Sequence, residues 1–256
     1  SAANYLLAHG HANPRWAGIG IATVITGDDV RLTNSSWRFS IAAFKQAMGL
    51  DRCLVVNDFT ALAMSLPALK STDLQALGGG VAVAGATIGL LGPGTGLGVS
   101  GLVPDASGRY SALAGEGGHV TLSANDDVES NLLALLRKQF DHVSAERVLS
   151  GSGLVNIYKA VCAMQGCAAR DLEPADVTDA AVAGTDAQCV QAVHYFTRFL
   201  GNVAGNLALT LGAMGGIYIG GGIVPRLGAA FDAAVFRRSF ENKGRYQPLL
   251  STLPVW

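Results

Sequence analysis

An α/β fold is predicted by two features of this chain of 256 residues. Segments with helical periodicity alternate with short apolar, β-branched segments, and glycine-rich turns follow several of the apolar segments. Half of the residues are hydrophobic, which is enough for a sizeable core. The length suits one large domain or two ordinary ones.

The elements expected before Pro67 follow from local patterns. The chain opens on the pattern of a helix already under way. Next come an apolar strand, a turn and a helix, which a serine caps at its start and a glycine ends. A short buried strand and a second helix follow. In order, these segments are Ser1–Leu7, Ala17–Ile25, Thr26–Asp29, Ser40–Gly49, Leu54–Val56 and Phe59–Ser65.

The elements expected after Pro67 begin with a hairpin, in which a glycine-rich turn joins two strands. A long apolar helix carries Gly201, Gly205, Asn202 and Asn206 at helical spacing, which indicates close packing against another helix. The strands are Ala86–Leu91, Val99–Val103 and Ile217–Ile219. The helices are Asp126–Phe140, one capped by Ser144, Asp186–Leu211 and one that begins after Pro225.

The composition argues against several classes of protein. The formal net charge is -1, without any basic stripe, so neither nucleic acid nor an anionic membrane is an expected partner. The four cysteines form no CxxC pair and no metal-binding spacing, so we expect reduced, mostly buried thiols of a cytoplasmic protein and no metal site. They are Cys53, Cys162, Cys167 and Cys189.

Two long stretches lack charge, Leu74–Pro104 and Phe199–Pro225. A spanning helix needs about 20 mostly apolar residues in continuous helix, and glycines break both stretches repeatedly. They therefore predict buried strands and glycine loops. No basic segment followed by an apolar run opens the chain, so no signal peptide is expected.

Asn57 and Asp58 stand at the end of a predicted buried strand and the start of a helix. Ligands of open α/β sheets bind at the carboxyl ends of strands, and a carboxylate there can accept the proton of a hydroxyl nucleophile. The alternative is that Asp58 merely caps the helix that opens at Phe59. Position alone favours the cap.

Three glycine-rich segments are further candidates, each with a structural alternative. Gly92–Gly98 could present backbone N–H groups and the Thr95 hydroxyl to an anion, or be an ordinary hairpin turn; it has no Walker lysine. Gly115–His119 could present Glu116 and His119 to the hydroxyl groups of a sugar, or it could be a solvated loop. Gly220–Pro225 could place backbone against a flat ligand, or be a strand-to-helix turn. Glu146 alone is most simply a first-turn acid of a helix.

The order of these segments resembles the bacterial glucokinase family, within the actin-like ATPase and sugar kinase superfamily. The resemblance covers nearly the whole chain, and the run His142–Gly151 is too long for chance. The other matching segments are Leu32–Trp37, Val56–Ala61, Gly94–Gly98, Gly115–His119, Asn206–Leu209, Gly220–Pro225 and Asn242–Arg245.

The resemblance implies an ATP-dependent kinase that makes glucose 6-phosphate, with Mg²⁺ on the ATP phosphates. Asp58 is then the general base. Its sugar partners are Asn57, Glu116, His119 and Glu146. The second phosphate turn is Gly94, Thr95 and Gly96, and the adenosine site includes Gly220, Gly221 and Gly222.

The same resemblance implies a two-domain, actin-like (ribonuclease H-like) fold with an interdomain cleft. We expect a smaller domain at residues 1–66 and a larger one at 67–256, in a protein that forms a homodimer. The family's first phosphate loop, of Asp-Gly-Gly-Thr type, and its last strand and helix are absent from the sequence, so an incomplete small domain is expected. The zinc loop of the related repressor and open-reading-frame kinases is absent as well.

Two other functions stay open at this point. The chain could be a catalytically impaired sugar-binding fragment or regulatory relative, because the first phosphate loop is missing. It could also be a kinase for another hexose, such as mannose or fructose.

Overall fold

The computed structural model describes residues 2–10, 13–32 and 36–256. The chain divides into two compact units, Ser1–Ala68 and Leu69–Trp256. Residues 33–35 of the matching segment Leu32–Trp37 lie outside the described residues. No helix among the described residues is long and apolar enough to cross a membrane.

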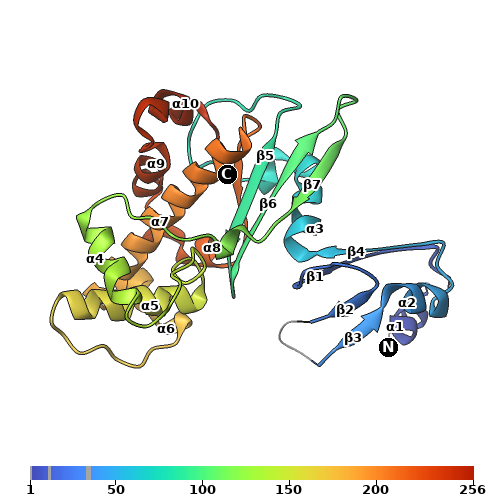
Figure 1. Cartoon of the computed structure of the whole chain (residues 1–256), viewed down its shortest axis with the longest axis horizontal. Coiled ribbons are helices and arrows are strands. Elements are labelled where there is room, and N and C mark those ends of the chain that lie inside the picture. Colours follow the sequence, from blue (N-terminus) through green and yellow to red (C-terminus); the bar gives the residue numbers. More distant parts are fainter. Residues whose placement is uncertain (1, 11–12, 33–35) are drawn as a thin grey trace. The chain divides into compact units, whose positions relative to one another are not determined.

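The described residues of the first unit form two small sheets and three α-helices. Strand β1 pairs in parallel with β4, which sets Ile21 opposite Asn57, and β2 pairs antiparallel with β3. The elements in order are α1 (Ala2–Ala8), β1 (Trp16–Ile21), β2 (Asp29–Arg31), β3 (Arg38–Ser40), α2 (Ile41–Ala47), β4 (Arg52–Asn57) and α3 (Asp58–Ser65) (Figure 1).

The predicted caps of α2 are confirmed. The Ser40 side chain accepts a hydrogen bond from the Ala43 N–H at 3.0 Å, and Gly49 follows the helix at a φ of 64°. The predicted strand to Ile25 is too long, because the chain turns after Ile21. The Thr23 N–H donates to the Ile21 carbonyl, and the Thr23 hydroxyl donates to the Arg31 carbonyl at 2.7 Å.

The second unit is built on one four-stranded sheet with the order β7-β6-β5-β8. β5 and β6 form the predicted hairpin, β7 continues it antiparallel, and β8 lies parallel to β5 on the other side. The strands are β5 (Ile88–Pro93), β6 (Leu97–Pro104), β7 (Tyr110–Ala114) and β8 (Ile217–Ile219) (Figure 1). Both hairpin strands extend further toward the turn than predicted, so only residues 94–96 remain as the turn. The predicted start of the first strand at Ala86 is wrong, since β5 begins at Ile88.

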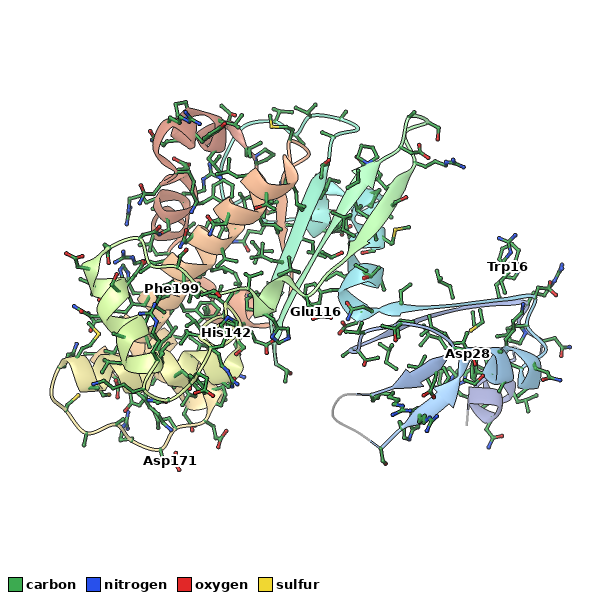
Figure 2. All side chains as sticks on the ribbon, viewed as in Figure 1. Trp16, Asp28, Glu116, His142, Asp171 and Phe199 are labelled. Carbon is green, nitrogen blue, oxygen red and sulfur yellow. The ribbon has the colours of Figure 1, made fainter. Side chains whose placement is uncertain are left out.

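Helices pack beside this sheet around the long helix α7 (Ala187–Leu211) (Figure 1). Phe199 is fully buried in the middle of α7 (Figure 2). Gly201 and Gly205 face α9, and a Cβ on Gly201 would lie 2.3 Å from the Phe236 carbonyl oxygen, so the predicted close helix packing is confirmed. The remaining helices are α4 (Asp127–Leu136), α5 (Gly151–Met164), α6 (Pro174–Ala183), α8 (Ile223–Leu227), α9 (Ala233–Glu241) and α10 (Gln247–Thr252).

Three predictions about helices are wrong. No helix begins at Ser144, because residues 144–149 form turns and the next helix, α5, is capped by Ser150. α4 ends at Leu136, before the predicted Phe140. α8 begins at Ile223 rather than after Pro225, since a proline in the first turn removes no N–H that the helix needs.

The cysteines differ in burial. Cys162 and Cys189 are buried, Cys53 is partly buried and Cys167 is exposed, so the prediction of mostly buried thiols is wrong for Cys167. Burial raises the pKa of the Cys189 thiol to about 12.

Candidate functional site

Asn57 and Asp58 lie at the junction of β4 and α3, as predicted. Asn57 caps the helix, because its Oδ1 accepts hydrogen bonds from the N–H groups of Phe59 at 2.9 Å and Thr60 at 3.3 Å. Asp58 is therefore not the cap but the first helical residue, with an exposed carboxylate. Its Oδ1 also accepts from the Phe59 N–H at 2.9 Å, which orients the group and leaves its other oxygen in solvent.

The hairpin turn Gly94–Gly96 is held from two sides. Within the turn, the Gly94 N–H donates to the Gly96 carbonyl at 2.8 Å. The Gly94 carbonyl accepts from the N–H of Gly151, the first residue of α5, at 2.9 Å. Thr95 is exposed at the tip. The turn is thus a fixed loop that presents backbone and one hydroxyl, the arrangement that suits an anion.

Glu146 reaches this hairpin rather than serving a helix of its own. Its Oε2 accepts a hydrogen bond from the Leu97 N–H at 2.8 Å, across 49 positions of sequence. A Cβ on Gly96 would lie 2.4 Å from the same oxygen, so only glycine leaves room for the carboxylate at that position. The interpretation of Glu146 as a first-turn acid is therefore wrong. Oε1 remains available to a ligand.

The loop that carries Glu116 and His119 packs against the start of β6. A Cβ on Gly118 would lie 2.2 Å from the Leu97 carbonyl oxygen, and the Gly118 carbonyl accepts from the Glu146 N–H at 2.9 Å. The His119 Nε2 lies 3.9 Å from the Glu116 Oε2, and both side chains are more than half exposed. Figure 2 shows Glu116 on the segment that follows β7.

These contacts bring three predicted sugar partners into one neighbourhood of the second unit. Leu97 is their common anchor, because it bonds Glu146 through its N–H and packs on Gly118 through its carbonyl. The turn Gly94–Gly96 directly precedes it. Asp58 and Asn57 belong to the first unit, and their meeting with Glu116, His119 and Glu146 at one ligand stays a prediction.

The glycines after β8 lie against the end of β5. The Gly220 N–H donates to the Leu91 carbonyl at 2.8 Å. Gly221 has a φ of 81°, and a Cβ there would lie 2.3 Å from the Pro93 carbonyl oxygen, so both conformation and space require glycine. Gly222 caps α8.

A cavity of about 270 Å³ joins two of the predicted nucleotide segments, since Gly94 and Gly222 both line it. Its other walls come from the first turns of α5 and α6 and from α8, where Arg226 pairs with Asp179 at 2.9 Å. The full lining is Gly94, Gly151, Leu154, Pro174, Ala175, Thr178, Gly222, Ile223 and Arg226.

Most of these cavity residues were not predicted from sequence. Ser150-Gly151 and Glu173-Pro174 are local signals of helix starts, and both starts occur. Nothing in either signal shows that the two starts face one cavity, because that depends on how α5 and α6 pack.

Comparisons with known proteins agree with the sequence motifs. The chain matches the family described as Glucokinase over residues 2–256. It is 53% identical over 253 residues to a glucokinase of Paramagnetospirillum magneticum, covering 98% of this chain and 79% of that relative.

Solved structures show the same likeness. A glucokinase from an Antarctic psychrotroph has a TM-score of 0.91 at 38% identity, covering 99% of this chain and 79% of that chain. A ROK family glucokinase from Streptomyces griseus, solved with glucose and AMPPNP, has a TM-score of 0.60 at 20% identity, covering 90% of this chain and 73% of that chain; this likeness concerns the fold alone. The predicted fold class, that of the actin-like sugar kinases, is confirmed.

Proposed function

The chain belongs to the glucokinase family, and from that premise we propose that it transfers the γ-phosphate of ATP to the 6-hydroxyl group of glucose. Two relatives that share about half of its residues are named glucokinases, and a structural neighbour was solved with glucose and AMPPNP. In this proposal, residues 1–66 and 67–256 act as the smaller and larger domains.

Asp58 is the proposed general base. Its carboxylate is exposed at the end of β4 and is held by the Phe59 N–H, so it can accept the proton that the 6-hydroxyl loses as it attacks phosphorus. Asn57, which is fixed by its capping bonds, still has its side-chain N–H₂ group for a sugar oxygen; the donor bond to the Thr23 carbonyl is long, at 3.4 Å.

Glu116, His119 and Glu146 are the proposed partners of the other hydroxyls. The single observation that carries this assignment is the contact of Glu146 Oε2 with the Leu97 N–H, because it ties a sugar-binding carboxylate to the strand that leaves the phosphate turn. A sugar with a misplaced hydroxyl would leave one of these acceptors unpaired, at a cost of about 1–3 kcal/mol. Glucose is the proposed substrate because the relatives are named glucokinases.

ATP is proposed to bind along the turn Gly94–Gly96 and the glycines Gly220, Gly221 and Gly222. The cavity that Gly94 and Gly222 share supports this, because the first turn of α5 places the positive end of a helix dipole beside the phosphate turn. Thr95 would add a hydroxyl donor. Mg²⁺ would be held mainly by the ATP phosphates and water, and would neutralise charge on the transferred group.

The proposed setting is a homodimer in the cytoplasm, which the family resemblance implies. Closure of two domains around the sugar would exclude water and so protect ATP from hydrolysis.

Replacement of the proposed base tests the function. We expect Asp58→Ala to lower kcat for glucose 6-phosphate formation by about 10²–10⁴-fold, the usual contribution of a general base, while glucose binding measured by calorimetry largely survives. Asp51→Asn is the matched control, since Asp51 is an aspartate of the same unit that pairs with Arg15 at the surface. Full activity of Asp58→Ala would reject the role.

The same assay distinguishes the rival function. A wild-type chain that binds glucose but forms no glucose 6-phosphate with ATP and Mg²⁺ would be the impaired sugar-binding relative. A calorimetric panel of hexoses identifies the preferred sugar, and tighter binding of mannose or fructose than of glucose would reject glucose as the substrate.

A further inference from the structure

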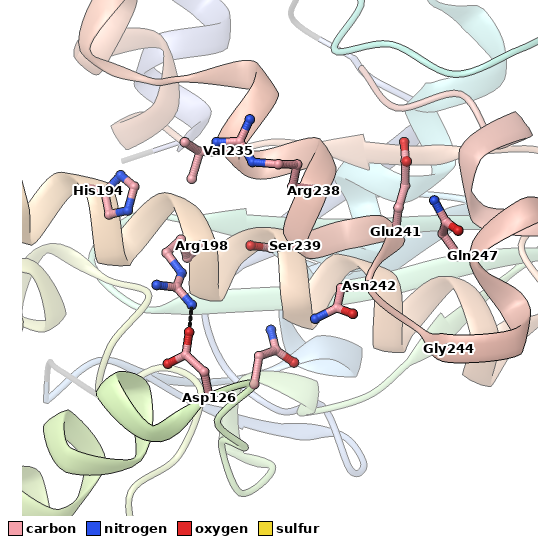
Figure 3. A pocket seen from close by; sticks show the side chains of 11 residues that line it. Asp126, His194, Arg198, Val235, Arg238, Ser239, Glu241, Asn242, Gly244 and Gln247 are labelled. Carbon is pink, nitrogen blue, oxygen red and sulfur yellow. Dashed lines mark hydrogen bonds and ion pairs between the residues drawn. The ribbon is translucent and has the colours of Figure 1, made fainter.

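A second, larger pocket of about 610 Å³ opens between α7, α9 and the segment that precedes α4 (Figure 3). None of its lining residues lines the cavity beside Gly94, and none is a proposed substrate or nucleotide residue. Its walls include Asp126, Arg198, Arg238, Ser239, Glu241 and Asn242.

The carboxylates of this pocket are already paired. Arg198 forms ion pairs with Asp126, as Figure 3 shows, and with the fully buried Glu129 below it at 2.8 Å. Glu241 is paired with Arg237, one turn away on α9, at 2.6 Å. Arg198 is shared by two of these acids, and the ammonium group of Lys243 interacts with the charge of Glu129 as well. The three cations Arg198, Arg237 and Lys243 therefore balance the three acids Asp126, Glu129 and Glu241.

Two other side chains of the wall have no such partners. The Arg238 side chain is exposed, and its guanidinium forms no ion pair or hydrogen bond with the described residues, so it supplies the surplus positive charge. Ser239 is only 9% exposed, yet its hydroxyl bonds to no described residue. Figure 3 shows the Ser239 oxygen directed into the pocket between Arg198 and Asn242. Although the residue is largely buried, its hydroxyl oxygen is accessible from the pocket, so its hydrogen-bonding capacity is available to a polar ligand.

We propose that this pocket binds a small phosphorylated metabolite of about the size of a sugar phosphate. Arg238 supplies the fork of N–H donors that matches a phosphate group, and the Ser239 hydroxyl adds a donor at the pocket floor. The amide groups of Asn125, Asn242 and Gln247 along the rim can bond to hydroxyls. The volume exceeds that of inorganic phosphate and falls within the range of small-molecule sites.

The occupant would bridge three elements that are already tied together beneath it. The side-chain amide of Asn202 on α7 uses both of its polar atoms: Nδ2 donates to the Ser123 carbonyl at 3.1 Å, and Oδ1 accepts from the Nζ of Lys243, just after α9. The walls are therefore fixed before a ligand binds, which lowers the entropic cost of binding.

Calorimetry with ribose 5-phosphate tests the site, because this compound carries a phosphate and hydroxyls but is not the product of the proposed reaction. We expect Arg238→Gln to weaken binding by about tenfold, and Ser239→Ala to weaken it by a few fold, with unchanged thermal stability. Arg245→Gln is the matched control, since it removes one positive charge from an exposed arginine nearby that does not line the pocket. It should bind ribose 5-phosphate as the wild type does.

Two further probes identify the chemistry that is recognised. Ribose alone should not bind measurably, and inorganic phosphate should bind more weakly than ribose 5-phosphate. Equal affinity of the wild type and Arg238→Gln for ribose 5-phosphate would overturn the proposal, as would equal affinity for ribose and its phosphate. Neither ATP nor glucose is present, so the outcome is independent of the proposed function.

Discussion

The two units of the chain bury apolar side chains to very different extents. The first unit has five buried hydrophobic residues among those described: Val30, Leu50, Val55, Ala63 and Leu66. The main core cluster of the molecule extends from Leu77 to Val255 and lies wholly in the second unit. In the first unit, large apolar side chains such as Trp16 and Leu54 are 71% and 64% exposed. Figure 2 labels Trp16 on β1.

This difference separates two kinds of functional residue. Glu146 is held by a backbone N–H and by glycine contacts at the edge of a dense core, so its position is set by many neighbours. Asp58 stands on a unit with little buried surface, and its nearest fixed partners are local to its own helix. Substitutions of the same type should therefore be costly in the second unit and mild in the first.

The largest difference in the free energy of unfolding is expected between two variants that each remove one arginine, one from each unit. Arg198→Met leaves the buried Glu129 and the neighbouring Asp126 without their cation, and we expect a loss of about 3–5 kcal/mol in the free energy of unfolding. Arg15→Met removes an exposed pair with Asp51, which should change stability little because such pairs contribute about 0–1 kcal/mol. Urea denaturation measures both.

Similar losses of stability in the two variants would contradict the comparison of the two units. They would mean that the exposed pair stabilises the first unit as strongly as the buried network stabilises the second. Burial raises the pKa of Glu129, so the loss in Arg198→Met should be smaller at acidic pH, where the carboxyl group takes up a proton.

Elements with strong local signals could be predicted from the sequence. Asp186 caps α7 and Ser40 caps α2, each through a hydrogen bond to a backbone N–H of the first turn. The β5–β6 hairpin follows from two apolar strands around glycines. In each case the information lies within about four residues of the feature, and the side-chain period supplies the rest.

The site itself depends on contacts that local patterns do not contain. Ser144 and Glu146 have the spacing of a helix start, but Val148 and Leu149 are fully buried and Glu146 bonds to Leu97, so the segment forms turns instead. The packing contacts win over the local preference because they bury apolar area and satisfy the Leu97 N–H. The cavity between α5 and α6 could not be predicted for the same reason, because it depends on packing contacts between segments far apart in the sequence.

A smaller difference in stability is expected between two variants in which alanine replaces a glycine, one in each unit. Gly201→Ala should destabilise the protein by about 1–3 kcal/mol, because the new Cβ would lie 2.3 Å from the Phe236 carbonyl oxygen and α7 or α9 must shift. Gly18→Ala on β1 meets no atom within 4 Å and should be neutral or slightly stabilising. Thermal unfolding of both variants checks this. A marked loss in Gly18→Ala would show that the first unit is packed more tightly than its exposed side chains indicate.

The smallest expected effect concerns the response of the second unit to pH. Burial lowers the pKa of Lys243 to about 8, from an ordinary value of 10.5, although the negative charge of Glu129 opposes this. Between these two values the unfolded chain holds a proton that the folded chain has released, so this lysine makes stability rise as pH rises through that range.

The variant Lys243→Met isolates this contribution. Its unfolding free energy should lack the rise, so the difference between wild type and variant should grow in favour of the wild type from about pH 8 toward pH 10.5. Titration of the cysteines in the same range is common to both proteins and cancels in the difference. We expect an effect of about 1 kcal/mol or less, because Lys243 is only partly buried and solvent screens its charge. Parallel pH profiles of the two proteins would show that the ammonium group is as well solvated in the folded chain as in the unfolded one, which would contradict its place within the buried network of Asn202 and Glu129.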